Sequence, residues 1–264
     1  MTAVTQTLLS CTVENAIATL TLNHPPVNAL TPDVLAELDA VFDALAGNKD
    51  VKAVILTGVG RFFIAGADIN VLAAIPSSRE GQEMALRGQA IFTKIEQFEK
   101  PVIAAINGVC LGGGLELAMC CHIRLVAEGA RLGQPEINLG IIPGFGGTQR
   151  LSRLIGRSKA LELILTGDLI SAAEAKVLGL VSHVVPPEEL LRQAQGLSRK
   201  IASKGRLAVR AALRAVTESD EMSLQEALRH EAQLFAELCD SADKREGVAA
   251  FLEKRQPQFK DGES

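Results

Sequence analysis

The sequence predicts an α/β fold, because strand-like and helix-like stretches alternate along much of the chain. Three observations support this prediction. Short apolar runs such as Ala53 to Thr57 and Val102 to Ile106 are typical of buried strands. Stretches with apolar residues at helical spacing follow them, and glycine-bearing turns join the two kinds of stretch. Repeated alternation of this kind is typical of a sheet with helices packed against it.

The chain opens with two apolar runs, Leu8 to Val13 and Ile17 to Leu22. Only Glu14-Asn15-Ala16 separates them, which predicts a hairpin of two strands. Thr31 and Pro32 then supply an N-cap and a proline at the first helical position. The helix that they start presents one apolar face, formed by Val34, Leu35, Leu38, Val41, Phe42 and Leu45.

The middle of the chain repeats this pattern. The strand at 53–57 ends at Gly58-Val59-Gly60, and Ser77-x-x-Glu80 predicts a capping box at the start of a second helix. The apolar stripe of that helix consists of Met84, Ile91, Ile95 and Phe98. Pro101 ends the helix, and the strand at 102–106 follows. A triple glycine at 112–114 then leads into an apolar helix from about Leu115.

The C-terminal part is almost entirely helical in its pattern. Capping boxes at Ser171-x-x-Glu174 and Ser223-x-x-Glu226 mark helix starts, and only Val181 to Val185 resembles a strand. The stretch from Leu197 to Phe251 is Ala-rich and carries a large apolar face. Such a face must be buried, either on the core of its own chain or on another subunit.

Composition argues against several classes of protein. The 264 residues are 47% hydrophobic and 22% charged, as in an ordinary globular protein. A net charge of −4 and the lack of Tyr and Trp argue against a nucleic-acid partner. Apolar runs are too short to span a membrane, and Met1 to Ser10 lacks the features of a secretory signal. Five cysteines without a CxxC pair indicate reduced thiols, so we expect a cytoplasmic protein. No metal site is expected, because His230-Glu231 is followed by Leu234 where an HExxH zinc helix needs histidine.

Three glycine-bearing turns are the candidate sites for chemistry. They span Phe62 to Ile69, Asn107 to Ala118 and Gln134 to Arg150. We find no dinucleotide-binding GxGxxG, no P-loop and no GxSxG nucleophile elbow in the sequence. The triple glycine at 112–114 is the most informative feature, because it lies between a strand and a helix. Free backbone N–H groups and the helix dipole can face a ligand there, and Glu116 follows within the first turn.

Each polar residue in these turns also has an ordinary structural explanation. Glu116 can complement the dipole of its helix, and Glu136 can be a loop or N-terminal helix residue. Asp68 can cap a turn, and His122 can be a buried, hydrogen-bonded histidine. The cysteines at 110, 120 and 121 are expected to be small core residues.

Together, the three turns resemble the crotonase (enoyl-CoA hydratase/isomerase) superfamily. The resemblance rests on the AGADI, NGxxxGGGxELA and QPEIxLGxxPGxGGTQRL segments, which stand in the same order and at similar separations. It extends from about Val13 to Phe259 and implies a spiral of ββα units followed by helices that form trimers, two of which commonly stack into a hexamer. We therefore expect residues 1–196 to form the core with the CoA and active site, and residues 197–264 to form a helical trimerisation region.

The resemblance also implies the reacting groups. The backbone N–H groups of Ala67 and Gly113 match an oxyanion hole for the thioester carbonyl. Glu116 and Glu136 match the two glutamates of the hydratases, and we assign Glu116 to water activation and Glu136 to proton donation. Because one must be ionised while the other is protonated, we predict surroundings that push their pKa values apart. Gly144 matches the position of a water-orienting amide.

For coenzyme A, the resemblance indicates the AGADI turn and the loop after the first hairpin. The matching residues are Val27, Ala65, Ala67, Asp68 and Ile69. Phe251 and Lys254 match an aromatic residue and a lysine that often cover the CoA of a neighbouring subunit. No separate cofactor is expected, because the substrate itself carries the CoA. Phe145 is bulky where small residues are also common, so the sequence does not fix the acyl chain length.

The function that the two glutamates favour is enoyl-CoA hydratase. Such an enzyme adds water reversibly, in the syn sense, to a trans-2-enoyl-CoA and gives a 3-hydroxyacyl-CoA. The alternatives are an enoyl-CoA isomerase or branched-chain acyl-CoA hydratase of the same family, and a non-catalytic member that binds CoA or acts as a scaffold. Product analysis separates them, because an isomerase gives no 3-hydroxyacyl-CoA.

Overall fold

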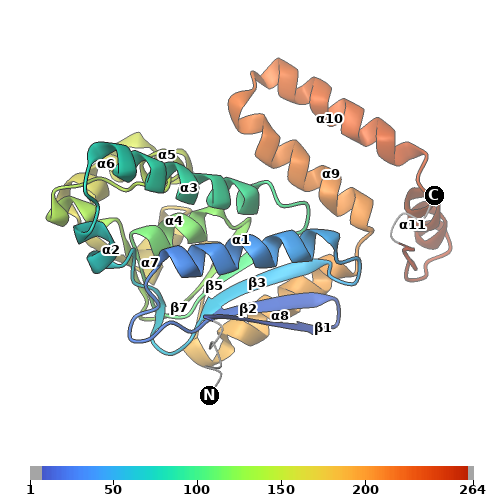
Figure 1. Cartoon of the computed structure of the whole chain (residues 1–264). Helices are drawn as coiled ribbons and strands as arrows, with labels where there is room; N and C mark the ends of the chain where they lie inside the picture. Colours follow the sequence, from blue (N-terminus) through green and yellow to red (C-terminus); the bar gives the residue numbers. More distant parts are fainter. Residues whose placement is uncertain (1–7, 261–264) are drawn as a thin grey trace.

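Strands and helices alternate along most of the chain, so the α/β prediction is confirmed (Figure 1). The structure is a computed structural model that describes residues 8–260. Residues 1–7 of the predicted core and residues 261–264 of the predicted helical region lie outside the described residues. Most of the stretch considered as a secretory signal, Met1 to Ser10, lies outside them as well.

The larger of two sheets has six strands within the described range. Its order is β1 (Leu9–Glu14), β2 (Ile17–Leu22), β3 (Ala53–Gly58), β5 (Val102–Ile106), β7 (Ile123–Ala127) and β10 (His183–Val185). The first two strands form the predicted antiparallel hairpin, in which Glu14 pairs with Ile17 across the turn. The other neighbours are parallel, as expected for strands that are joined through helices.

The smaller sheet brings the three glycine-bearing turns together. Its order is β4 (Phe62–Ile64), β6 (Val109–Leu111), β8 (Arg131–Gly133) and β9 (Leu169–Ser171). Each of β3, β5 and β7 is followed along the chain by its counterpart β4, β6 or β8 and then by helical structure, which is the predicted spiral of ββα units. Because β4, β6 and β8 are parallel neighbours, the residues after their carboxyl ends meet at one edge of this sheet.

Helices cover both faces of the larger sheet. Side chains alternate between the faces of a strand, and on β3 Val54 and Leu56 belong to the main core whereas Ile55 belongs to a second cluster with Leu190 and Ala194. The helices that precede the last three in the chain are α1 (Pro32–Gly47), α2 (Ile69–Ala73), α3 (Ser78–Glu96), α4 (Gly113–Cys120), α5 (Gly147–Ile155), α6 (Arg157–Thr166), α7 (Ala172–Val177) and α8 (Leu190–Ala202), with short 3₁₀ helices η1 (Pro135–Leu139) and η2 (Pro187–Glu189).

Most of the predicted helix caps are present. Thr31 accepts a hydrogen bond from the third residue of α1, and Ser171 and Ser223 form the predicted capping boxes with their glutamates. The predicted box at Ser77 is wrong. Its hydroxyl contacts the Glu80 carboxylate directly and accepts no backbone N–H, so the side-chain pair replaces the cap.

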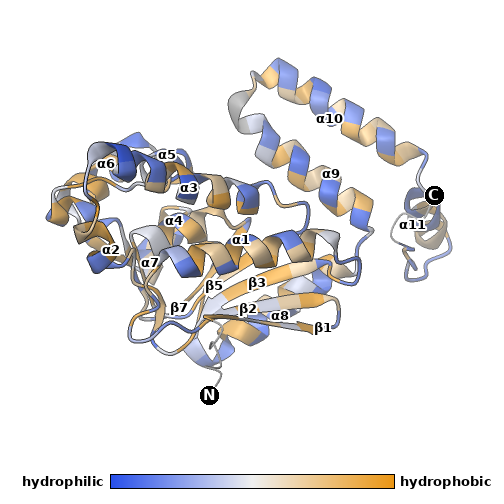
Figure 2. Cartoon of the chain, viewed as in Figure 1, coloured by the Kyte–Doolittle hydropathy of each residue, from blue (hydrophilic) through white to orange (hydrophobic). Residues whose placement is uncertain are grey.

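The last helices extend away from the two sheets (Figure 1). They are α9 (Arg206–Thr217), α10 (Leu224–Cys239) and α11 (Ala242–Leu252), and a 3₁₀ helix, η3 (Glu218–Glu221), joins α9 to α10. Figure 2 shows hydrophobic and hydrophilic residues alternating along α9 and α10. Large hydrophobic side chains are exposed on these helices in the single chain, among them Val216, Leu224, Leu228, Phe235, Val248, Phe251 and Leu252. The predicted apolar face is therefore present, and its burial on another copy stays a prediction.

The division of the chain after residue 196 also stays a prediction. That boundary lies within α8, which packs on the larger sheet through Leu190, Ala194 and Leu197. The helices that stand apart from the sheets begin at Arg206. In the described range, no helix combines the length and the apolar character that a membrane crossing requires.

Candidate active site

A cavity lies where the turns after β4, β6 and β8 meet. It has a volume of about 290 Å³, and two carboxylates, Glu116 and Glu136, interrupt its largely apolar walls. The lining residues are Ala65, Gly66, Ala67, Ile69, Leu72, Ile75, Gly81, Met84, Ala85, Gly112, Gly113, Glu116, Pro135, Glu136, Leu139, Ile141, Ile142, Gly144 and Phe145. The three segments that the sequence singles out therefore form one site.

Glu116 lies in the first turn of α4 and is only 2% exposed. Its Oε1 accepts hydrogen bonds from the backbone N–H groups of Phe145 (2.8 Å) and Gly147 (2.7 Å). Gly147 is the first residue of α5, so the carboxylate also faces the positive end of that helix dipole. These contacts favour the ionised form, whereas burial favours the protonated form. Burial has the larger effect and raises the pKa of Glu116 to about 7.

Glu136 lies on η1, just after β8, and is half-buried. Gln134 is fully buried beside it, and with its amide nitrogen turned toward Glu136 it lies 3.0 and 3.1 Å from the two carboxylate oxygens. Gly112 gives this carboxylate its space, because a Cβ at position 112 would lie 2.8 Å from Glu136 Oε1. Burial raises the pKa of Glu136 to about 7 as well.

The prediction that the surroundings push the two pKa values apart is wrong. Both values rise to about 7, because burial acts on each carboxyl group in the same direction. At Glu116 the charge of Glu136 raises the pKa further, and the N–H groups of Gly147 and Phe145 oppose this rise. Near neutral pH both carboxyl groups therefore titrate, and the charge of Glu136 influences the titration of Glu116.

Ala67 and Gly113 place two backbone N–H groups on one wall of the cavity. Leu30 pairs with the carbonyl of Gly66 (2.8 Å) and the N–H of Asp68 (3.0 Å), which directs the intervening N–H of Ala67 away from that pairing. Gly113 is the first residue of α4, so its N–H has no partner within the helix. The Cβ position of Gly113 lies 3.6 Å from Ala67 N. Within the described range neither N–H donates to another backbone group, and such a pair suits an oxygen that gains negative charge.

The other predicted site residues, apart from Phe251 and Lys254, lie at or beside the cavity. Gly144 lines it, and the carbonyl of Gly144 accepts a hydrogen bond from Gln89 Nε2 (2.8 Å). Among the residues assigned to CoA, Ala65, Ala67 and Ile69 line the cavity. The carbonyl of Val27 accepts from Ala65 N (3.2 Å), and Asp68 caps α2 by accepting from the N–H of residue 70 (2.7 Å).

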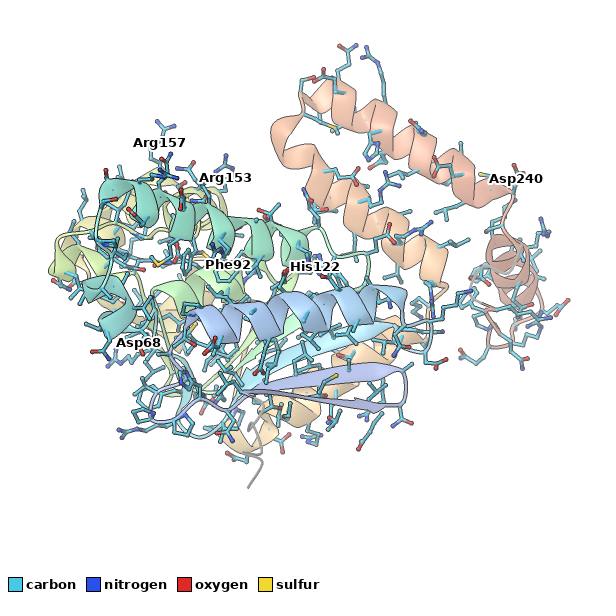
Figure 3. All side chains as sticks on the ribbon, viewed as in Figure 1. Asp68, Phe92, His122, Arg153, Arg157 and Asp240 are labelled. Carbon is cyan, nitrogen blue, oxygen red and sulfur yellow. The ribbon has the colours of Figure 1, made fainter. Side chains whose placement is uncertain are left out.

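Phe251 and Lys254 do not lie at the cavity of their own chain. Phe251 is 83% exposed near the end of α11, and Lys254 follows that helix. Figure 3 shows Asp68 near α2 at one end of the molecule and Asp240, which ends α10, at the other. A contact of Phe251 or Lys254 with CoA therefore needs a second copy of the chain. The assignment of Phe251 and Lys254 to CoA stays a prediction.

The ring of Phe145 forms part of the apolar wall. It packs edge-to-face on Phe92, with ring centroids 5.5 Å apart. Gly88 of α3 gives it space, because a Cβ at position 88 would collide with the ring. The small residue at 88 therefore compensates for the bulky residue at 145.

His122 and the cysteines at 110, 120 and 121 have structural roles, as predicted. His122 Nδ1 accepts a hydrogen bond from Val102 N (2.8 Å), and its Nε2 lies 3.1 Å from the carbonyl of Glu96, which assigns the ring proton to Nε2. Burial lowers the pKa of His122. The three cysteines are buried, and burial raises their pKa values.

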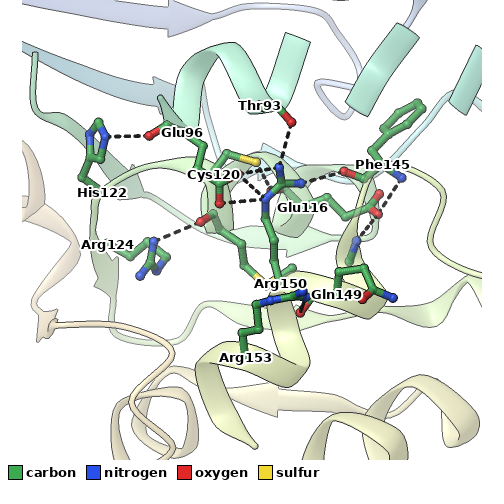
Figure 4. A network of polar contacts seen from close by, with 12 residues as sticks. Thr93, Glu96, Glu116, Cys120, His122, Arg124, Phe145, Gln149, Arg150 and Arg153 are labelled. Carbon is green, nitrogen blue, oxygen red and sulfur yellow. Dashed lines mark hydrogen bonds and ion pairs between the residues drawn. The ribbon is translucent and has the colours of Figure 1, made fainter. Parts of the chain in front are cut away.

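Sequence reasoning misses four groups at this site. Two are the backbone N–H donors of Phe145 and Gly147, and one is the buried amide of Gln134. The fourth is Arg150, which binds Glu96 and the carbonyl of Phe145 behind Glu116 (Figure 4). Gln134 and Arg150 stand inside the third glycine-bearing turn, but nothing in the spacing of that turn reveals their partners.

The chain is similar to known proteins along almost its whole length. The family model described as enoyl-CoA hydratase/isomerase matches residues 12–262. A "Probable enoyl-CoA hydratase" from Bacillus subtilis (strain 168) is 47% identical over 253 residues, which cover 96% of this chain and 98% of that protein. The crotonyl-CoA hydratase of Syntrophomonas wolfei is 46% identical and is matched over 93% of this chain and 95% of its own. A crystal structure of enoyl-CoA hydratase from Bacillus anthracis has a TM-score of 0.92 and 40% identity, with 96% of this chain and 99% of that chain covered. The chain therefore belongs to the enoyl-CoA hydratase/isomerase family and has the crotonase fold.

Proposed function

We propose that this protein is an enoyl-CoA hydratase that adds water across the C2–C3 double bond of a trans-2-enoyl-CoA and gives a 3-hydroxyacyl-CoA. The observation that carries the proposal is the pairing of Glu116 and Glu136 in one apolar cavity with two backbone N–H groups that donate to no backbone group in the described part of the chain. Hydration needs a base for water, an acid for C2 and donors for the carbonyl oxygen. The site contains one candidate for each task.

In the proposed mechanism the N–H groups of Ala67 and Gly113 hold the thioester oxygen. Glu116 takes a proton from water while the oxygen of that water forms a bond to C3. The electron pair of the double bond moves onto the carbonyl oxygen, where the two donors stabilise the enolate. Glu136 then gives its proton to C2, and the carbonyl re-forms. In the reverse direction the two carboxyl groups exchange these roles.

Both pKa values rise to about 7 and do not separate the roles, so this assignment is drawn from the hydrogen bonds that each carboxyl group accepts. Glu116 accepts two backbone hydrogen bonds at the positive end of α5, and these contacts stabilise an ionised base. Glu136 faces the side-chain amide of Gln134 and, in the described range, accepts no backbone N–H from another residue, and we assign it as the protonated acid. We also infer that the N–H of Gly144, on the cavity wall, orients the attacking water.

The CoA moiety is proposed to lie along the Ala65 to Ile69 turn and beside Val27, where backbone groups approach the mouth of the cavity. Phe251 and Lys254 would cover the CoA of a neighbouring copy in a homotrimer or a hexamer of two trimers. The exposed apolar face of α9 to α11 supports such an assembly. The proposed reaction needs no cofactor beyond the CoA that the substrate carries, and a cytoplasmic location fits a chain with free cysteines at the five described positions.

The direct test is the loss of ultraviolet absorbance of the conjugated enoyl thioester, measured with crotonyl-CoA and longer enoyl-CoAs. Chromatography of the products should give the matching 3-hydroxyacyl-CoA. A shifted double bond without hydroxylated product would replace the proposal by an isomerase. CoA-ester binding without any turnover would favour a non-catalytic member of the family.

Replacing Gly113 by Ala is expected to lower kcat/KM for crotonyl-CoA by about 10²-fold, the scale expected when the thioester oxygen is displaced from its donors by about 1 Å. The added Cβ would lie 3.6 Å from Ala67 N, in the space where the thioester oxygen must approach both donors. Its contact with Leu30 Cδ1 (2.9 Å) involves the end of a flexible side chain, so the fold should persist. Gly196→Ala on α8 is the matched control, because a Cβ there meets no atom within 4 Å. Equal activity of both variants would show that a Cβ at position 113 does not obstruct the thioester oxygen and would contradict this placement of the substrate.

A further inference from the structure

The segment from Phe145 to Gly147 is held from two sides. On one side, the N–H groups of Phe145 and Gly147 donate to Glu116 Oε1 at 2.8 and 2.7 Å. On the other side, Arg150 NH1 donates to the carbonyl of Phe145 at 3.0 Å. That carbonyl belongs to the peptide between Phe145 and Gly146, which lies between the two peptides whose N–H groups bind Glu116. Fixing this peptide therefore fixes the orientation of both donors.

Gly146 lets the guanidinium reach this position. Its φ of 108° lies in the region that favours glycine, and a Cβ there would collide with Arg150 NH1. The carbonyl of Gly146 also accepts from the backbone N–H of Arg150 (2.9 Å), so the first turn of α5 ties the two residues together. The contact between Arg150 and the loop thus depends on the absence of a side chain at position 146.

Arg150 is itself held by the last turn of α3. Its Nε lies 3.0 and 3.1 Å from the two oxygens of Glu96, and its NH2 lies 2.7 Å from Glu96 Oε2 and 3.4 Å from Thr93 Oγ1 (Figure 4). The side chain of Arg150 is 13% exposed, against 35% for Glu96. A two-pronged pair of this kind fixes the plane of the guanidinium, which a lysine cannot reproduce.

The guanidinium also acts on Glu116 through its charge. Burial is the main cause of the raised pKa of Glu116, and the positive charge of Arg150 is one of the effects that oppose it. The charge of Glu136 raises the pKa of this carboxyl, and Arg150 itself forms an ion pair with Glu96. Arg150 therefore supports the ionised base both by geometry and by charge.

We propose that Arg150, clamped by Glu96, is a positioning residue for hydration: it fixes the Phe145–Gly146 peptide so that two backbone donors orient the Glu116 carboxylate toward water. This inference rests on the proposed hydratase activity. It adds a residue that does not line the cavity and acts only through Glu116.

Arg150→Met should lower kcat for crotonyl-CoA on the order of 10²-fold, the scale expected when a reacting group is misplaced by about 1 Å, while KM changes little. The acidic limb of its pH–rate profile should move to higher pH, because the loss of the cation makes ionisation of Glu116 harder. Arg150→Lys should keep that limb near its wild-type position yet still lose kcat, since lysine keeps the charge but not the fork. Glu96→Gln, which preserves Arg150, should lower kcat without the upward shift.

Arg153→Met is the matched control, because Arg153 is exposed one turn along α5 and, among residues 8–260, hydrogen-bonds only to Gln149. A double variant completes the test: in a Glu116→Gln background, Arg150→Met should cause no further loss of kcat. A full additional loss there, or an Arg150→Met enzyme with wild-type kcat and pH profile, would overturn the proposal. If the wild-type protein does not hydrate crotonyl-CoA at all, it is the proposed function that fails, and the two failures are therefore distinguishable.

Discussion

Glu116→Gln is expected to lower kcat for crotonyl-CoA hydration by about 10²–10⁴-fold, the usual contribution of one acid–base group. The glutamine side chain keeps nearly the same volume, and its oxygen can still accept from the N–H groups of Phe145 and Gly147. It cannot take a proton from water. Initial rates of absorbance loss at several crotonyl-CoA concentrations separate kcat from KM, and KM should change little because the CoA contacts are untouched.

The same substitution should leave the protein at least as stable as the wild type at pH 8. The folded-state pKa of Glu116 is raised from 4.5 to about 7, so the folded protein binds this proton more tightly than the unfolded chain. The free energy of unfolding of the wild type therefore falls as pH rises through that interval, and a neutral glutamine removes the penalty. Thermal unfolding at pH 5 and pH 8 measures this difference. Glu128→Gln, at an exposed turn, is the control; an inactive Glu116→Gln variant that also unfolds at lower temperature would point to a structural role instead.

The sequence predicts the fold well where the local pattern and the tertiary environment agree. The hairpin of β1 and β2, the N-cap at Thr31 and the buried strands β3 and β5 follow directly from apolar patterning and capping chemistry. The start of α4 is less well predicted, because the pattern gives Leu115 whereas the helix begins at Gly113. Glycines carry no side-chain signal, and here the peptide geometry of Gly112, with φ of 50°, decides where the helix begins.

The active site, like the fold, is predictable from the sequence only in part. Glu116, Glu136 and the glycine-bearing turns are recognisable in the sequence, and the parallel order of β4, β6 and β8 explains why they meet. Their pKa values are not recognisable there, because these depend on burial from every side and on donors such as Phe145 N. The clamp between Arg150 and Glu96 joins residues 54 positions apart, and either residue alone resembles an ordinary surface charge.

Glu136→Gln should also lower kcat for hydration by about 10²–10⁴-fold, and it should lose a reaction that Glu116→Gln retains. If Glu136 faces C2, its ionised form can remove a C2 proton from a saturated thioester such as butyryl-CoA, with the enolate held by Ala67 and Gly113. In deuterated water the wild type and Glu116→Gln should therefore exchange the C2 hydrogen, as seen by mass spectrometry, whereas Glu136→Gln should not. Exchange that depends on Glu116 instead would reverse the two assignments.

The pH dependence of the residual hydration gives an independent check on the same variants. Hydration by the wild type needs an ionised Glu116 and a protonated Glu136, so its rate should rise and then fall around pH 7, where both groups titrate. Glu136→Gln removes the group whose deprotonation causes the fall, and its residual rate should only rise with pH. Glu116→Gln removes the group responsible for the rise, and its residual rate should only fall. Because the charge of Glu136 raises the pKa of Glu116, the remaining limb of Glu136→Gln should also move to lower pH.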